Sequence, residues 1–178
     1  FTVSWAQSTV TVTSLADDGT SGTLRWAMDT ANADVNINEI IFDIGLTGTI
    51  TLTSNLPNVA SNLGISGPGA TSITISGDNQ FKMFVVNTGF VLDISGFTLT
   101  SSASGPTSSG NIFHVSRSTV NASDIVFTGI TNSTPFVSRE GTSALNISNS
   151  TFSNNSATLF RSDYGSTPNT TSDTESDY

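Results

Sequence analysis

The sequence predicts an all-β protein: a single-stranded right-handed parallel β-helix, or solenoid, whose N-terminal end is capped by an α-helix. Three observations support this prediction. Many short stretches alternate apolar and polar residues, apolar residues recur in columns roughly every 20–30 residues, and one stretch alone has helical spacing. The 178 residues are the length of one domain with a continuous core.

The strand prediction comes from alternation with a period of two. Residues 9–14 (TVTVTS), 48–54 (GTITLTS), 71–77 (TSITISG) and 90–100 (FVLDISGFTLT) alternate in this way, and Gly, Asn, Asp and Pro separate such stretches as turns. Because successive side chains of a strand point to opposite faces, each stretch has one apolar face.

The solenoid prediction comes from apolar residues that recur in register. Four columns are formed by Leu92, Val120 and Leu145; by Ile94, Ala122 and Ile147; by Leu99, Phe127 and Phe152; and by Phe84, Phe113, Phe136 and Phe160. We expect Ile50 and Ile73 to continue the first column upstream. In-register recurrence favours parallel coils stacked about 4.8 Å apart, whereas a β-sandwich needs tight hairpin turns, and Asn-Gly or Asp-Gly turns are scarce here.

The helix is predicted over residues 22–33, within SGTLRWAMDTANA (21–33). Leu24, Ala27 or Met28, and Ala31 share one face, and Ser21 or Thr23 can cap the start of the helix. A solenoid must cover the apolar end of its first coil, so we interpret this helix as the cap. The alternative is a helix packed beside a sandwich.

The domain prediction is a β-helix over residues 1–160 followed by a polar, acidic tail over 161–178, which has the composition of a disordered segment. The first residues, FTVSWAQSTV, fit either the end of a secretory signal or an ordinary edge strand.

The charge balance argues against some partners. Lys and Arg total 5 against 14 Asp and Glu, a net charge of −9, which repels nucleic acid and anionic lipid. No apolar run approaches the ~20 residues of a membrane-spanning helix. The absence of cysteine fits either redox compartment.

No catalytic, cofactor-binding or metal-binding residue is predicted. In the stacked coils Asp93 aligns with Asn121 and Asn146, which gives that outward column a single acid. His114 is expected on the outer surface, in a column with Val85 and Val137. Residues 16–22 (ADDGTSG) could hold calcium through Asp17 and Asp18, but they lack EF-hand spacing, and a hydrated turn is the preferred interpretation.

Charged residues are expected to pair between coils. Arg117 and Glu140 occupy the same register position in successive coils, and so do Arg139 and Asp163. We interpret these pairs as an inter-coil charge ladder; the alternative is a charged binding groove.

Candidate N-glycosylation sites gather in the second half of the chain. Six Asn-x-Ser/Thr sequons begin there, at Asn121, Asn132, Asn146, Asn149, Asn154 and Asn169. The nine asparagines before Asn121 begin none. Asn121 and Asn146 share an outward column, which can carry either glycans or a ladder of polar side chains.

Four blocks of the chain, between about Val10 and Ser101, resemble secreted and cell-surface β-helix proteins with a CSLREA-type N-terminal motif. These blocks are TVTSLADDGTSGTLRWAM, IIFDIGLTGTITLTSNLP, GISGPGATSITISG and FVVNTGFVLDISGFTLTSS. Gly22 to Met28 stand where the motif reads C-S-L-R-E-A-I: Leu24, Arg25 and Ala27 match, Gly22 replaces the Cys and Trp26 replaces the Glu. Arg25 therefore needs another partner, for which Asp17, Asp18 and Asp29 are the candidates.

The resemblance implies surface display, adhesion or a structural role, and it carries no common set of catalytic residues. The predicted function is therefore a secreted, extracellular, non-enzymatic structural or adhesive protein that assembles into a filament or surface layer. Its expected partners are copies of itself or surface glycans. The alternatives are a polysaccharide-degrading lyase or hydrolase, marked by a cleft with converging carboxylates, and a carbohydrate-binding module that uses Trp5, Trp26 or Tyr164.

Overall fold

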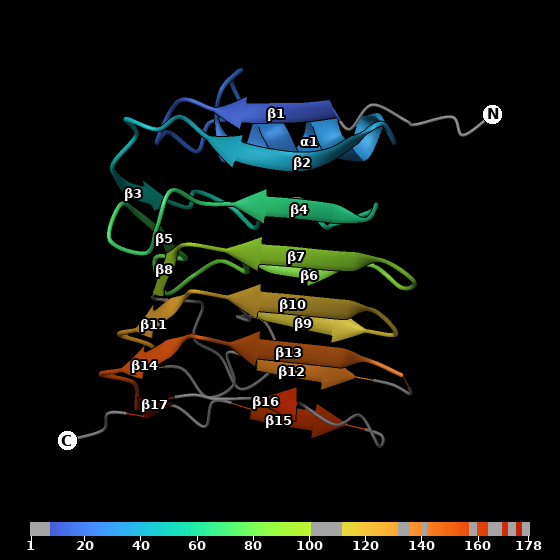
Figure 1. Ribbon diagram of the computed structural model, residues 1–178, viewed down its shortest axis with the longest axis vertical. Coiled ribbons are helices and arrows are strands. Elements are labelled where there is room, and N and C mark those ends of the chain that lie inside the picture. Colours follow the sequence, from blue (N-terminus) through green and yellow to red (C-terminus); the bar gives the residue numbers. More distant parts are fainter. Residues whose placement is uncertain are drawn as a thin grey trace.

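The computed structural model describes residues 8–100, 112–131, 136–139, 142–156, 160–163, 169–170 and 174–175. Within these residues the chain forms one helix and seventeen short strands, and each strand pairing is parallel (Figure 1). The strands stack along one axis as a solenoid, so the predicted parallel β-helix is confirmed.

Three sheets form the walls of the solenoid. Sheet A is β1 (Ser8–Val12), β2 (Ile37–Phe42), β4 (Leu63–Ser66), β7 (Val91–Ser95), β10 (Thr119–Ser123), β13 (Ala144–Ser148) and β16 (Asn169–Thr170). Sheet B is β3 (Gly48–Thr51), β5 (Ile73–Ser76), β8 (Thr98–Thr100), β11 (Val126–Thr128), β14 (Thr151–Ser153) and β17 (Thr174–Glu175). Sheet C is β6 (Phe84–Val86), β9 (Phe113–Ser116), β12 (Phe136–Arg139) and β15 (Phe160–Asp163).

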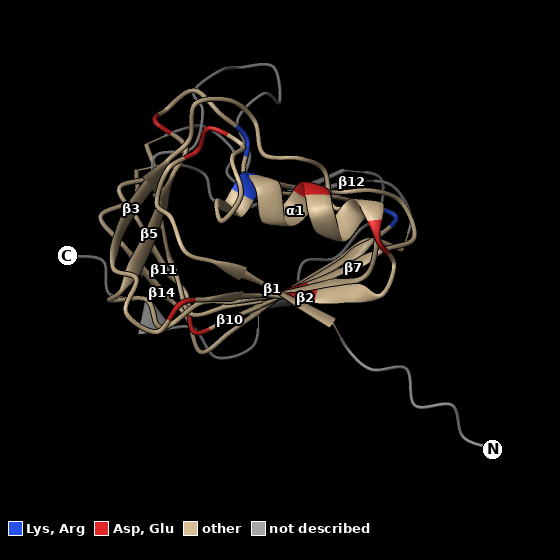
Figure 2. Ribbon diagram, turned by 90° about the horizontal axis from the view of Figure 1, so that it is seen from above, with Lys and Arg blue, Asp and Glu red and all other residues tan. Residues whose placement is uncertain are grey.

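Each complete coil passes through sheets A, B and C in that order and winds in the right-handed sense (Figures 1 and 2). Among the described residues four coils have all three strands, the first beginning at β4 and the last ending at β15. Strand pairing also continues past residue 160, the predicted end of the β-helix: β15, β16 and β17 pair with β12, β13 and β14.

The register confirms the predicted apolar columns. Leu92, Val120 and Leu145 are direct partners in sheet A, and Leu99, Phe127 and Phe152 are partners in sheet B. The prediction for Ile50 and Ile73 is wrong. Ile50 pairs with Ile75, 25 residues on, and Ile75 pairs with Leu99, so both isoleucines belong to the Leu99 column of sheet B. The sequence analysis matched Ile50 with Ile73, 23 residues on, although the two belong to different columns. The two candidates were hard to tell apart because Ile73 and Ile75 both point inward.

Aromatic rings fill the interior along the solenoid axis. The ring centroids of Phe127 and Phe152 lie 4.7 Å apart in a stacked arrangement, and Phe113 meets Phe127 edge-on at 6.2 Å. Phe84 and Phe113 continue the row at 5.8 Å. Each ring therefore bridges neighbouring coils as well as filling its own, which links the coils through apolar contact.

The helix α1 (Leu24–Ala33) lies across the N-terminal end, on the side of sheet C, as Figure 2 shows. The four residues that share its apolar face are completely buried: Leu24, Ala27, Met28 and Ala31. The helix begins two residues later than predicted because Thr23 has an extended backbone and acts as the N-cap, accepting a hydrogen bond from the Trp26 N–H. This arrangement agrees with the predicted cap.

The corners after β7, β10 and β13 of sheet A each contain a left-handed residue. Gly96, Asp124 and Asn149 take φ angles of 78°, 56° and 49° at equivalent positions in three successive coils. Gly, Asp and Asn are the residues that adopt this conformation at least cost. The same turn chemistry thus keeps three coils in one register.

Candidate functional site

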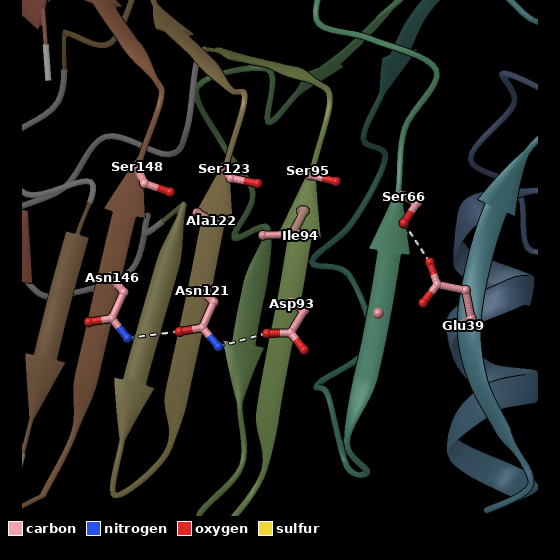
Figure 3. Close-up of a pocket in the computed structure, with 11 residues that line it drawn as sticks. Glu39, Ser66, Asp93, Ile94, Ser95, Asn121, Ala122, Ser123, Asn146 and Ser148 are labelled. Atoms are coloured by element: carbon pink, nitrogen blue, oxygen red, sulfur yellow. Dashed lines mark hydrogen bonds between the residues drawn. The ribbon is translucent and has the colours of Figure 1, made fainter. Parts of the chain in front are cut away.

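The outer face of sheet A carries two columns of polar side chains that run parallel to the solenoid axis (Figure 3). Strand register aligns them. The first column is Glu39, Gly64, Asp93, Asn121 and Asn146, and the second is Ser66, Ser95, Ser123 and Ser148. The residues adjacent to these on the same strands point inward and form the core. The outward positions are not part of the core, so they are free to vary in chemistry.

Hydrogen bonds connect successive coils along the first column. Asn146 Nδ2 donates to Asn121 Oδ1 at 2.8 Å, and Asn121 Nδ2 donates to Asp93 Oδ1 at 2.7 Å. The ladder ends on a carboxylate, which can only accept when ionised. Figure 3 shows the three side chains in line across β13, β10 and β7.

Glu39 brings a second carboxylate to the same column, which corrects the expectation of a single acid. Glu39 is the register partner of Gly64, and Gly64 is the partner of Asp93. The two acids therefore lie on strands separated by one strand, about 10 Å apart at their backbones. The alignment of repeats within the sequence did not include Glu39. Glu39 lies upstream of the stretches that repeat clearly, so the sequence did not show which residue of the next coil it pairs with.

The side chain of Glu39 lies over Gly64. A Cβ placed on Gly64 would come within 2.0 Å of Glu39 Oε2, so the carboxylate occupies the space that any other residue at position 64 would fill. Glu39 Oε1 also accepts a hydrogen bond of 2.5 Å from the Ser66 hydroxyl. These contacts hold the Glu39 carboxylate on the side of the groove that faces Asp93.

The two columns enclose a shallow groove of about 380 Å³ along the outer face of sheet A. A second hollow of about 210 Å³ adjoins it and is also lined by Glu39, Gly64 and Asp93. Both hollows therefore meet over Gly64. Among the described residues that line them there is neither a lysine or arginine nor an aromatic residue.

This lining can make many hydrogen bonds and few apolar contacts. It offers hydroxyls that donate and accept, amides that do both, and two carboxylates. Such a surface suits a ligand rich in hydroxyl or amine groups, and the open shape suits an extended polymer that follows the axis. A pair of carboxyl groups on one surface is also the usual requirement for glycoside hydrolysis, and Glu39 and Asp93 supply such a pair along one side of the groove.

The candidate glycosylation asparagines differ in their surroundings. Asn121 and Asn146 belong to the groove ladder, so of the two alternatives for this column the structure shows the polar ladder. Asn149 Nδ2 donates to the Asp124 carboxylate, and Asn154 is exposed at a turn with a φ of 55°. Asn169 pairs through its backbone with Asn146 in sheet A, and Asn132 lies outside the described residues. Glycan attachment stays a prediction.

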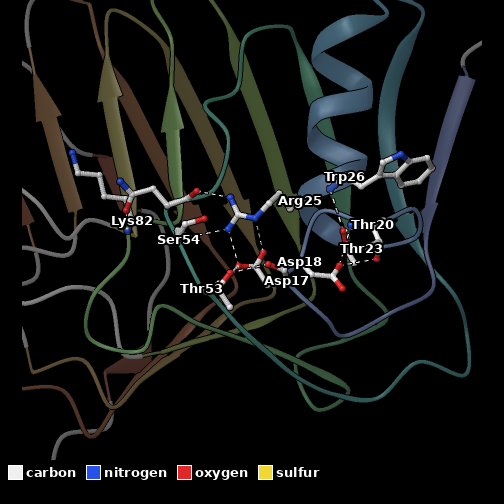
Figure 4. Close-up of polar contacts among 10 residues, drawn as sticks. Asp17, Asp18, Thr20, Thr23, Arg25, Trp26, Thr53, Ser54 and Lys82 are labelled. Atoms are coloured by element: carbon white, nitrogen blue, oxygen red, sulfur yellow. Dashed lines mark hydrogen bonds and ion pairs between the residues drawn. The ribbon is translucent and has the colours of Figure 1, made fainter.

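Of the three acids predicted as possible partners of Arg25, the structure pairs it with Asp17 (Figure 4). Its Nε and Nη2 donate to the two carboxylate oxygens at 3.0 and 2.7 Å, and Nη1 donates to the Asn55 carbonyl at 2.6 Å. The Asp17 carboxylate is completely buried and also accepts from the backbone N–H and the hydroxyl of Thr53. This cluster, the Arg25 clasp, ties the helix to the loops on either side and has a structural role.

The acids of residues 16–22 are held by separate groups. Asp17 is engaged in the clasp, whereas exposed Asp18 accepts hydrogen bonds from the hydroxyl and backbone N–H of Thr20. These two bonds lower the pKa of Asp18 below its ordinary value. Within the described residues no three His, Asp or Glu side chains cluster as a metal site, and calcium binding in this loop stays a prediction.

The other predicted positions fall where the register places them. Arg139 and Asp163 are backbone partners in sheet C, as the charge ladder requires. Arg117 follows β9, and its predicted partner Glu140 lies outside the described residues. His114 shares its column with Val85 and Val137, as predicted.

The aromatic residues suggested for carbohydrate binding do not form a row in the described structure. Trp26 is half-buried and packs against the core, while Trp5 and Tyr164 lie outside the described residues. The polar groove on sheet A is therefore the better-defined candidate site.

No family model matches the chain, and no curated protein or solved structure was found to be similar to it. In the part of the chain that the structure describes, no helix has the length and apolar character to cross a membrane.

Proposed function

We propose that this protein is a secreted, non-enzymatic adhesive surface protein that binds an extended glycan in the groove on sheet A. One observation carries the proposal: hydroxyl, amide and carboxylate side chains are aligned along the axis at one step per coil, about 4.8 Å. This step is close to the length of one pyranose unit, so successive sugars can meet equivalent side chains. The resemblance to surface β-helix proteins supports the extracellular location.

A panel of soluble glycans tests the proposal. Affinity gel electrophoresis against neutral, acidic and amine-bearing polysaccharides would measure retardation of the native protein. Ser95, in the middle of the groove, is the position to block: Ser95→Tyr fills the groove, and tyrosine is well tolerated in strands. We expect retardation by at least one glycan and its loss in this variant.

The matched control is Thr49→Tyr, because Thr49 is exposed on the outer face of sheet B, away from the groove. It should bind as the native protein does. Equal loss of binding in both variants, or no retardation by any glycan, would contradict the proposal.

A second candidate function is glycan hydrolysis, favoured by the two carboxylates that flank Gly64. One carboxyl group would protonate the glycosidic oxygen as the C–O bond breaks, and the other carboxylate would take a proton from the water that forms the new C–O bond. Release of reducing ends from the glycan panel tests this. Activity that disappears in Glu39→Gln and in Asp93→Asn would establish an enzyme in place of a binder.

Association between copies is also part of the proposal. In the described structure β1 is an edge strand that pairs only with β2, and a free edge is a template for a further strand. Negative-stain microscopy of the native protein, before and after mild dissociation, should show fibres or layers. Dispersed single particles at tens of micromolar would contradict this part of the proposal.

A further inference from the structure

We infer that the groove selects a glycan that carries protonated amines, such as a glucosamine oligomer, and that the selecting subsite is the hollow over Gly64 between Glu39 and Asp93. This inference rests on the proposed function, since it names the ligand class for the same groove. It is carried by the composition and geometry of that one part of the groove.

The charge around Gly64 has one sign. Glu39 and Asp93 are its neighbours on either side in the column, and the described residues lining both adjoining hollows include no lysine or arginine. With a net charge of −9, the chain as a whole reinforces the negative potential. A uronate polymer meets repulsion here, whereas an ammonium group is attracted.

The carboxylates also have accepting capacity to spare. One oxygen of Glu39 accepts from Ser66, and one oxygen of Asp93 accepts from Asn121, as Figure 3 shows. An ionised carboxylate has about four lone-pair positions on two oxygens. An ammonium group has three donors and no acceptor, so it matches what this subsite offers better than a hydroxyl does.

Gly64 makes the room for this interaction. The other members of the column carry side chains, and the missing side chain at Gly64 leaves a gap into which the Glu39 carboxylate leans. Because the backbone at Gly64 is not in the left-handed region, alanine is tolerated there by conformation. Its methyl group would, however, force the Glu39 carboxylate away from the subsite.

The test compares matched oligosaccharides by titration calorimetry at about pH 6, where a sugar amine carries its proton. The ligands are glucosamine oligomers, N-acetylglucosamine oligomers of the same length, and galacturonate oligomers. We expect the amine form to bind about tenfold more tightly than the acetylated form, with the uronate weakest.

Glu39→Gln and Gly64→Ala should each remove most of the preference for the amine. Two controls separate the subsite from general attraction between opposite charges. Asp29→Asn makes the same charge change on the exposed face of α1, and Gly45→Ala makes the same glycine change where a Cβ meets open space. Both should keep the preference.

Equal binding of amine and acetylated oligomers by the native protein would overturn the inference and leave the glycan-binding function standing. Tightest binding of the uronate would overturn it in the same way. A preference lowered as much by Asp29→Asn as by Glu39→Gln would also overturn it, because the attraction would then belong to the net charge. Binding of none of the three oligomers, together with no retardation by any glycan of the panel, would overturn both proposals.

Discussion

The N-terminal end of the solenoid (residues 8–56) and the repeating coils (residues 63–156) are held together by different means. In the repeating coils, columns of apolar inward residues continue from one coil to the next, as in the Leu92 and Leu99 columns. At the N-terminal end, a helix and the Arg25 clasp take the place of further strands. The groove crosses the boundary between the two regions, because Glu39 belongs to the first and Asp93 to the second.

This difference shows where the solenoid depends on single residues. Loss of one side chain from a repeating column leaves the equivalent side chains of the neighbouring coils in place. The Arg25 clasp has no such duplicate among the described residues, and its carboxylate is completely buried. The following predictions test the comparison, from the largest expected effect to the smallest.

Phe127→Ala should cost about 4 kcal/mol of the free energy of unfolding, because it removes a ring in contact with both Phe113 and Phe152 and leaves a cavity. Urea denaturation followed by circular dichroism measures this. The control is Val126→Ala on the half-buried outward side of the same strand, which should cost under about 1 kcal/mol. Equal costs for the two variants would contradict the assigned inward and outward faces.

Arg25→Met should cost about 3 kcal/mol, since it leaves the Asp17 carboxylate buried without its cation. Arg25→Lys keeps the charge but loses the bidentate contact with Asp17. Its free energy of unfolding should therefore lie between those of Arg25→Met and the native protein. The same denaturation experiment measures both. A cost below about 1 kcal/mol for Arg25→Met would show that the clasp is not what holds the N-terminal end.

Gly22→Ala should cost about 2 kcal/mol. Its φ is +90°, and a Cβ there would lie 2.5 Å from Thr13 Oγ1. The matched control is Gly45→Ala, which meets open space and should be close to neutral. Thermal unfolding of the two variants side by side measures the difference, and equal midpoints would contradict the strain assigned to Gly22.

Asn121→Ala should cost about 1 kcal/mol or less, although it breaks the ladder at both of its hydrogen bonds. The side chain is exposed, so water replaces both partners. A cost as large as that of Arg25→Met would mean that the ladder is a structural element in the same sense as the clasp.

The smallest effect concerns pH. The folded protein lowers the pKa of Asp18, so this group stabilises the native state above the ordinary aspartate pKa and loses that contribution as the pH falls through the folded value. Asp18→Asn should therefore slightly lower the stability at neutral pH and leave it nearly unchanged at low pH, which flattens the acid limb of the stability profile. Denaturation midpoints of both proteins across the acidic range measure this, and a steeper acid limb in the variant would contradict the sign.

The repeating coils could be predicted because each inward position is tested again one coil later. Leu92, Val120 and Leu145 support one another as evidence, and a parallel stack is the fold that brings them together. The helix could be predicted from its own 3.6-residue spacing and its capping residue. Both signals are local or repeated, and neither depends on a single distant contact.

The groove could be predicted only in part. Asp93, Asn121 and Asn146 were aligned from the repeats, but Glu39 lies upstream, in a region with no clear repeat to set its register. The same reason explains the wrong placement of Ile50. Asp17 was one of three candidate partners for Arg25, and only the fold shows that the loop returns to bury it.

The most direct test of the central claim is an NMR titration of the native protein with the tightest-binding glycan of the panel. The account predicts shifts of backbone amides around Gly64 and Asp93 and of the side-chain amides of Asn121 and Asn146, with sheets B and C unchanged. Shifts on the outer faces of sheets B or C, or shifts spread evenly over the chain, would contradict a ligand site on sheet A.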